Sequence, residues 1–160
     1  MKKISIIMGS ESDLETVNET IKLLKEFKVE AEVKVLSAHR TPKELAAYVS
    51  AAPKRGVKVF IAAAGMSAAL SGVIASHTVL PVIGIPIESG SLKGLDALLS
   101  TVQMPPGIPV ASMAIGRAGA KNAALFALEI LGVSDRIIQS KLINYKKAIA
   151  AKIKNTKIKL

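Results

Sequence analysis

Two short polar segments carry residues that could bind an anion and move a proton. Residues 9–13 read Gly-Ser-Glu-Ser-Asp, and residues 37–42 read Ser-Ala-His-Arg-Thr-Pro. Each segment follows an apolar run and precedes a helical pattern. Histidine is the side chain best suited to proton transfer near neutral pH, and arginine offers a planar fork to phosphate. His39 beside Arg40 therefore suggests an enzyme that acts on a phosphorylated small molecule.

Both segments also have a purely structural interpretation. Ser12 and Asp13 are preferred helix N-cap residues, and His39 could itself cap or pack a helix. The first segment matches neither a dinucleotide-binding fingerprint nor a P-loop. His77, which precedes Thr78 near a predicted helix end, lacks comparable neighbours, so we interpret it as structural.

Small residues mark a third segment. Residues 62–65 read Ala-Ala-Ala-Gly and are followed by Met66, Ser67 and Ala68. Small side chains let a ligand lie close to the backbone, although they also serve tight packing of a helix on a sheet. The proline-rich residues 103–109 are expected to form a roof over the ligand site that these segments make. With two histidines and no cysteine, the chain shows no metal-ligand spacing, and we expect no metal site.

Strand-like and helical patterns alternate along the whole chain. The strands are continuous apolar runs, which is typical of a parallel sheet covered on both faces. Strands are predicted over residues 3–8, 30–36, 57–64, 81–85 and 108–114, and helices over about 13–28, 41–55, 67–77, 91–103, 121–131 and 134–154. Right-handed crossovers then give an α/β fold with three layers, a doubly wound five-stranded parallel sheet in flavodoxin-like order.

In such a sheet the strand-to-helix turns meet at the carboxyl ends of the strands. Backbone N–H groups and helix N-termini there can hold an anion, so the segments above are expected to form one crevice. We expect one domain over residues 1–160, with the α/β core ending near residue 132.

The last helix, about residues 134–154, has no obvious partner within its own fold. Its apolar residues recur at helical spacing, and such a stripe commonly packs against another subunit. They are Ile137, Ile138, Leu142, Tyr145, Ile149 and Ile153.

Composition narrows the classes of protein. Half of the residues are hydrophobic, too many for a disordered chain, whereas aromatics make up only 3%, too few for a binder of single-stranded nucleic acid. The net charge of +10 is concentrated after Asp135, because residues 1–135 carry 14 basic and 12 acidic side chains. No apolar run is long enough to span a bilayer. We expect a cytoplasmic protein with neither nucleic-acid nor membrane partners.

Taken together and in this order, the segments resemble the PurE family of purine biosynthesis. Besides the two polar segments, the matching pieces are Ala64-Gly65 with the helix after it, Pro81–Pro86, Gln103–Pro105 with Gly107–Val110, and Lys121–Ala124. The similarity covers about residues 3–131, and the ordered set is far more specific than any one piece.

The resemblance implies a reaction, a site and an assembly. The reaction is conversion of N5-carboxyaminoimidazole ribonucleotide into 4-carboxyaminoimidazole ribonucleotide without a cofactor, with His39 handling protons. Family members form homo-octamers, which agrees with the spare terminal helix. The substrate-binding residues implied by the match are Ser10, Ser12, Asp13, Ser37, Arg40, Ala64, Gly65, Met66, Ser67 and Leu70.

One position departs from the pattern of the mutases. Ala69 stands where most bacterial mutases have a second histidine, and residues 67–72 are closer to the related carboxylases, which fix free CO₂ onto aminoimidazole ribonucleotide. Those carboxylases tend to have lysine in place of Arg40. We therefore favour a mutase. The alternatives are a carboxylase and, outside enzymes, a non-catalytic nucleotide-binding module of the same fold.

Overall fold

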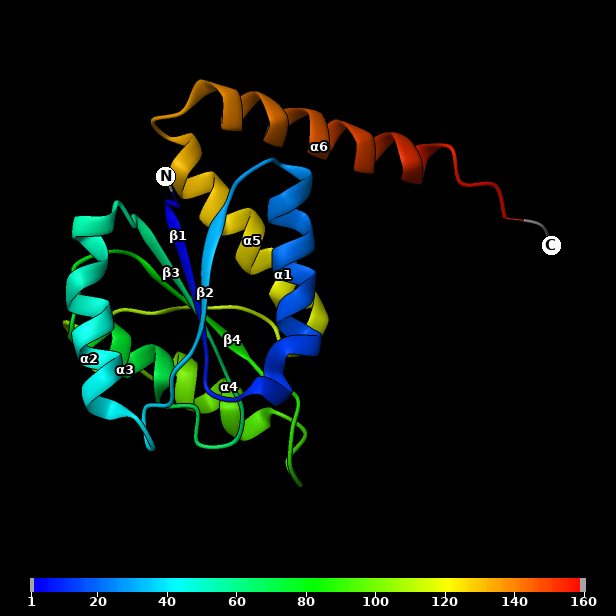
Figure 1. Ribbon diagram of the computed structural model, residues 1–160. Coiled ribbons are helices and arrows are strands. Elements are labelled where there is room, and N and C mark those ends of the chain that lie inside the picture. The colour runs from blue at the N-terminus through cyan, green and yellow to red at the C-terminus, as the bar shows by residue number, and fades with distance from the viewer. Residues whose placement is uncertain (1, 159–160) are drawn as a thin grey trace.

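The computed structural model describes residues 2–158 and has at its centre a five-stranded parallel sheet (Figure 1). The strands lie in the order β2-β1-β3-β4-β5, which confirms the predicted flavodoxin-like topology. They are β1 (Ile4–Met8), β2 (Ala31–Val35), β3 (Val59–Ala64), β4 (Val82–Pro86) and β5 (Ala111–Ser112).

Helices cover both faces of this sheet. In Figure 1, α1 and α5 lie to the right of it and α2 and α3 to the left, as a three-layer arrangement requires. The helices are α1 (Leu14–Glu26), α2 (Pro42–Ala51), α3 (Leu70–Ser76), α4 (Leu95–Val102), α5 (Gly116–Gly132) and α6 (Arg136–Lys154). Short 3₁₀ turns, Glu11–Asp13 and Ala52–Arg55, precede α1 and follow α2.

The strands are apolar because helices bury them from both sides. Every residue of β1 and β4 is buried, whereas the edge strand β2 is largely exposed. Two apolar cores result, one between the sheet and α1, α5 and α6, the other between the sheet and α2 and α3. The register places Met8 beside Val35 and Ala63, so the carboxyl ends of three strands are level.

Gly84 allows α4 to pack closely against β4. A Cβ atom at this position would lie 2.3 Å from Cγ2 of Thr101 on α4 and 3.4 Å from Cβ of Ser71 on α3. Both helices therefore lie on the same face of the sheet, the one that α2 also covers. The close packing of α3 and α4 on the sheet at this point depends on the absence of a side chain at Gly84.

Several helix and strand bounds differ from the predictions. The strand β5 has two residues instead of seven, and α4 and α3 begin at Leu95 and Leu70, later than expected. Conversely, α5 begins at Gly116 and not at Lys121. Its first turn contains Gly119, where a Cβ would lie 1.6 Å from the carbonyl oxygen of Ala114. A glycine pattern that resembles a loop is here a helix packed tightly on the preceding chain.

The terminal helix packs partly on its own subunit. Asp135, and not Ser134, is its N-cap, with a carboxylate oxygen that accepts hydrogen bonds from the amides of Ile137 and Ile138 at 3.1 and 3.2 Å. Ile138 and Leu142 are buried in the core beside α5, contrary to the expectation that this helix lacks a partner in its own fold. Farther along, Ile153 is 70% exposed.

Figure 1 shows the distal part of α6 extending beyond the sheet. None of the helices within residues 2–158 combines the length and the apolar character needed to cross a membrane.

Candidate active site

A cavity of about 550 Å³ opens at the carboxyl ends of the strands. It is lined from the turns after β2, β1, β3 and β4, the four neighbouring strands on that side of the sheet. All the catalytic and substrate-binding residues implied by the family resemblance line it: Ser10, Ser12, Asp13, Ser37, His39, Arg40, Ala64, Gly65, Met66, Ser67 and Leu70. The fold thus brings together segments that lie up to about sixty residues apart.

The turn after β1 is held by a reciprocal capping box. The Ser10 hydroxyl accepts the amide of Ser12 at 3.3 Å, and the Asp13 carboxylate accepts the amide of Ser10 at 3.1 Å. Ser10 is thus the N-cap of the 3₁₀ turn. Asp13 stands at the N-cap position of α1, as predicted, but its carboxylate closes the capping box of the preceding turn and makes no cap hydrogen bond to α1. The Ser12 hydroxyl donates to that of Ser10 at 2.9 Å, so the two hydroxyls form a pair at the cavity.

Asp13 is a buried carboxylate at the floor of this turn. Burial raises the pKa of Asp13 above its ordinary value, because the charged form loses its hydration. The hydrogen bond from the Ser10 amide and the positive charge of Arg40 act in the opposite direction and reduce the shift. A desolvated carboxylate beside a cation is characteristic of functional sites.

The turn after β2 is organised around Ser37. Its amide donates to the Thr41 hydroxyl at 2.8 Å, and its own hydroxyl accepts the amides of His39 and Arg40 at 3.3 and 3.2 Å. These bonds fix the backbone between β2 and α2, which begins with Pro42 at its first turn as predicted. The His39 side chain stands exposed at the rim of the cavity.

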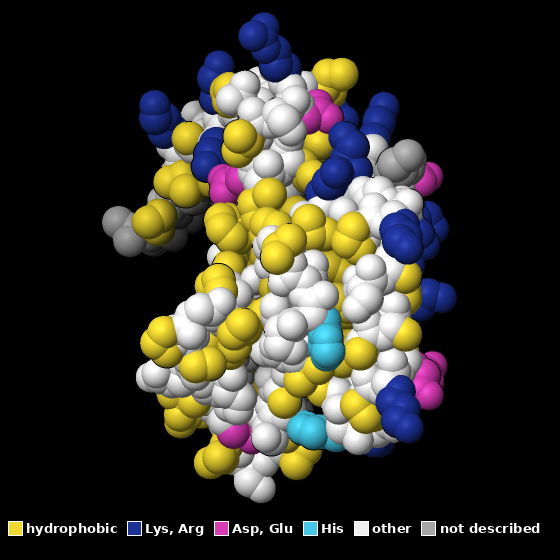
Figure 2. Space-filling model, turned by 90° about the vertical axis from the view of Figure 1, so that its left-hand side faces the viewer, with side chains coloured by type: hydrophobic (Ala, Val, Ile, Leu, Met, Phe, Trp, Pro, Cys, Tyr) yellow, Lys and Arg dark blue, Asp and Glu magenta, His cyan; other side chains and the backbone are white. Residues whose placement is uncertain are grey.

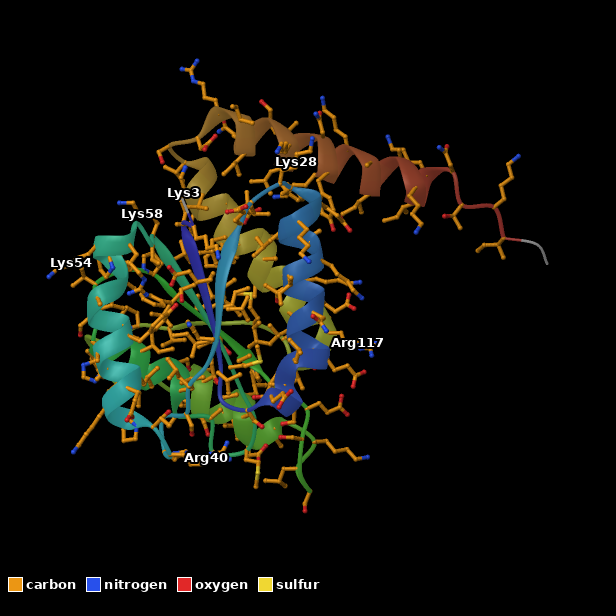
Figure 3. All side chains as sticks on the ribbon, viewed as in Figure 1. Lys3, Lys28, Arg40, Lys54, Lys58 and Arg117 are labelled. Carbon is orange, nitrogen blue, oxygen red and sulfur yellow. The ribbon has the colours of Figure 1, made fainter. Side chains whose placement is uncertain are left out.

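Arg40 ties the two turns together. Its Nη2 atom donates to the carbonyl oxygen of Gly9 at 3.0 Å, across the gap between the turns after β2 and β1. Figure 3 shows Arg40 at the lower end of the sheet, where these turns lie. Because guanidinium has five donors, this contact positions the side chain and still leaves others for a ligand.

The turn after β3 forms a third side of the cavity, next to the turns after β1 and β2, and its side chains are mostly small or apolar. Ala64, Gly65, Ala69 and Leu70 line it, and Met66 adopts a positive φ of 56°. Residues 87–89 follow β4 and complete this wall, where Ser89 lines the cavity. Ser89 was not singled out from the sequence. A lone serine in a loop carries no signal until the fold places it.

The prediction that the proline-rich residues 103–109 roof the cavity is wrong. Residues 103–109 lead into β5, so they lie at the amino ends of the strands, opposite the cavity. Gly107, Ile108 and Pro109 line a separate hollow of about 720 Å³, together with His77 and Pro81. Within residues 2–158, no three His, Asp or Glu side chains gather in a way that could hold a metal ion.

The fold and the cavity define a flavodoxin-like α/β protein with a polar crevice at the carboxyl edge of its sheet. Residues 3–152 match the family model described as AIR carboxylase. The chain belongs to this family, which confirms the resemblance to PurE.

Curated relatives match most of the chain. The N5-carboxyaminoimidazole ribonucleotide mutase of Pyrococcus abyssi is 56% identical over 91% of this chain and 83% of its own. The mutase of Saccharolobus solfataricus is 48% identical over 99% of both chains, and that of Bacillus subtilis 51% identical over 87% and 86%. The crystal structure of Treponema denticola PurE has a TM-score of 0.85 at 32% identity and covers 94% of this chain and 92% of its own.

Proposed function

We propose that the protein is an N5-carboxyaminoimidazole ribonucleotide mutase of purine (IMP) biosynthesis, an isomerase that moves a carboxylate from N5 to C4. The observation that carries the proposal is one cavity in which a histidine, an arginine and a wall of small side chains meet. The three relatives named above are mutases by name and are similar over nearly the whole chain.

The polar side of the cavity suits the ribose phosphate. Arg40 offers charge-assisted hydrogen bonds to phosphate oxygens, and the paired hydroxyls of Ser10 and Ser12 stand beside it. Asp13 can accept hydrogen bonds from the ribose diol. In this assignment Ser37 positions His39 and Arg40 through their amides.

The chemistry needs no redox step. The C–N bond of the N-carboxylate breaks, its electron pair stays on nitrogen, and CO₂ leaves. The enamine-like ring carbon C4 then attacks CO₂ and forms the new C–C bond. One proton is gained at N5 and one is lost from C4, so a single group at the ring could carry both. His39 takes the C4 proton, which restores aromaticity, and we propose neither metal nor ATP for the reaction.

The small-residue wall keeps CO₂ in place between the two bonds. Ala64, Gly65 and Ala69 leave room for a small apolar molecule, and buried Ala63 and Ala68 back them. Water excluded from this wall cannot compete with the ring carbon for CO₂. Most bacterial mutases have a histidine at position 69. Ala69 presents only a methyl group there and leaves more space in the cavity at this wall.

A direct assay of the purified protein tests the proposal. We expect turnover of N5-carboxyaminoimidazole ribonucleotide and little product from aminoimidazole ribonucleotide with bicarbonate at physiological concentration. Efficient turnover of the second pair alone would make the protein a carboxylase. Binding of either ribonucleotide without turnover would leave the non-catalytic module as the better description.

We further propose that the chain is a single cytoplasmic domain that assembles as a homo-octamer. In support, Leu95, Leu99 and Val102 line an exposed stripe of α4, each about 50% exposed, and Ile153 of α6 is 70% exposed. Figure 2 shows a face where hydrophobic side chains gather at the centre and left while most lysines and arginines lie at the top and right.

Truncation of α6 tests the assembly. Removal of residues 148–160 leaves Ile138 and Leu142 in their core, so the subunit should stay folded but form smaller particles in light scattering. Helical circular dichroism is the control for folding. Unchanged particle mass would show that the distal part of α6 makes no essential subunit contact.

A further inference from the structure

Two buried hydroxyls within residues 2–158 have no hydrogen-bond partner, those of Ser71 and Ser89. A buried polar atom without a partner destabilises the folded protein, since it has lost its bonds to water. Such an atom needs a physical reason, and the two serines differ in what surrounds them.

Ser71 lies inside α3, where its Cβ faces Gly84 of the sheet, and it does not line the cavity. Ser89 lies beyond the carboxyl end of β4 and lines the cavity. Its hydroxyl oxygen is 2.2 Å from the position that a Cβ on Gly65 would take. The hydroxyl therefore stands against the backbone of Gly65, in space left by the absent side chain.

The cavity wall beside Ser89 is largely apolar, and Ser67 is the other polar residue that lines it. Ala64, Gly65, Ala69 and Leu70 line the same wall, and the side chain of Met66 reaches Gly90 next to Ser89. Apart from the weakly accepting thioether sulfur of Met66, none of these apolar side chains offers an acceptor. Against Gly65 the hydroxyl has almost no exposed surface. Rotation about its Cα–Cβ bond turns it into the cavity, where an acceptor on a bound ligand can satisfy it.

With the phosphate bound to Arg40 as proposed, the strand order gives the end of the ligand that faces Ser89, while the ring still lies within the cavity that His39 lines. Arg40 follows β2, Asp13 follows β1, Gly65 follows β3 and Ser89 follows β4, in that spatial order across the edge. A ribonucleotide whose phosphate binds Arg40 extends toward β3 and β4 with its base. The group it presents near Gly65 and Ser89 is the one attached to the ring.

We propose that the Ser89 hydroxyl donates a hydrogen bond to the transferred carboxylate of the substrate, on N5 before the reaction and on C4 after it. The inference rests on the proposed function and names one more substrate-binding residue for it. A carboxylate accepts a stronger hydrogen bond than a neutral group does, so the buried hydroxyl is matched to this ligand. During transfer the same bond holds an oxygen of CO₂ near the ring carbon.

Calorimetric binding of two ribonucleotides to the Ser89→Ala variant tests the inference. One ligand is 4-carboxyaminoimidazole ribonucleotide, and the other is aminoimidazole ribonucleotide, which lacks the carboxylate. We expect roughly 10- to 100-fold weaker binding of the carboxylated ligand, the usual effect of losing a hydrogen bond to a charged group. Binding of the other ligand should stay unchanged.

The Ser71→Ala variant is the matched control, because it removes the other unpartnered hydroxyl away from the cavity. It should bind both ligands as the wild type does. Ser89→Ala should also melt no lower than the wild type without ligand, since no internal hydrogen bond is lost. During turnover it should release more aminoimidazole ribonucleotide per product formed.

Equal losses for both ligands, or no loss for either, would overturn the role of Ser89 while the wild type still binds and turns over. A wild-type protein that binds neither ribonucleotide would instead contradict the proposed function itself.

Discussion

The two ends of the sheet make an instructive comparison, because each has a hollow and a histidine. The amino end holds the larger hollow, about 720 Å³ with His77, and the carboxyl end the smaller one, about 550 Å³ with His39. Lysine and arginine are absent from the lining of the larger hollow, whereas Arg40 lines the smaller. Volume alone would choose the wrong end; converging polar groups identify the site.

Charge is distributed differently at the two ends. Figure 3 shows Lys3, Lys54 and Lys58 toward the upper, amino end and Arg40 at the lower end. Lys3 is paired at 3.4 Å with Asp135, the cap of α6. Having many cations does not make a binding site. At the lower end one arginine, held by the carbonyl oxygen of Gly9, is aimed where helix N-termini also meet.

The two capping aspartates show the same contrast. At the amino end, the hydrogen bond from the Ile138 amide holds the pKa of Asp135 below its ordinary value. At the carboxyl end, burial raises the pKa of Asp13. One cap stabilises the fold in its charged form, and the other lowers stability when charged. A buried carboxylate whose charge lowers stability is characteristic of functional sites.

Substitution of each histidine in turn should give the largest difference between the two ends, measured as turnover. His39→Asn should lower turnover by about 10²–10⁴-fold, the usual contribution of a general acid–base, and leave ribonucleotide binding largely intact. His77→Asn is the control at the other end and should retain wild-type turnover. Comparable losses in both variants, or none in His39→Asn, would return His39 to a capping role.

Arginine substitutions should give a smaller effect. Arg40→Ala should weaken binding of the phosphorylated ligand by about 1.5–3 kcal/mol, the usual contribution of hydrogen bonds to a charged group. The dephosphorylated nucleoside should lose much less. Arg55→Ala, which removes an ion pair with Glu32 at 3.0 Å near the amino end, should leave the affinity for both unchanged in titration calorimetry.

The smallest expected effect is on the pH dependence of folding stability, tested by substitution of Asp13. Because the folded pKa of Asp13 is raised, the folded state binds more protons than the unfolded state between the ordinary and the raised pKa, and stability falls as pH rises through that window. Asp13→Asn should therefore be more stable than the wild type at neutral pH. The difference should disappear toward about pH 4, the ordinary range of an aspartate.

Asp135→Asn should behave in the opposite way. Its folded pKa is lowered, so the charged cap contributes stability above the ordinary pKa that is lost as pH falls through the folded value. The variant should be less stable at neutral pH, and the gap should close in acid. Urea unfolding across the pH range measures both, and the same sign for the two variants would refute the contrast between the ends.

The sequence predicted much of this arrangement because periodicity and turn chemistry are local. Apolar runs identified four of the strands and an alternating pattern identified β2, and the residues after three of the strands gave the polar and small-residue walls of the cavity. What escaped prediction depends on distant packing. Gly119 is helical because α5 presses on Ala114, and Ser89 belongs to the site because it meets Gly65. The loop at residues 103–109 is a different case: it precedes β5, and a loop that precedes a strand lies at the amino edge, so the strand order along the chain was enough to place it.

The central claim is that CO₂ formed at the small-residue wall reaches C4 without leaving the protein. Turnover of N5-carboxyaminoimidazole ribonucleotide in the presence of labelled CO₂ tests this most directly. The account predicts 4-carboxyaminoimidazole ribonucleotide with little label, because the transferred carboxylate comes from the substrate itself. Product labelled to the level of the surrounding CO₂ would contradict it and make the methyl group of Ala69 the mark of a carboxylase.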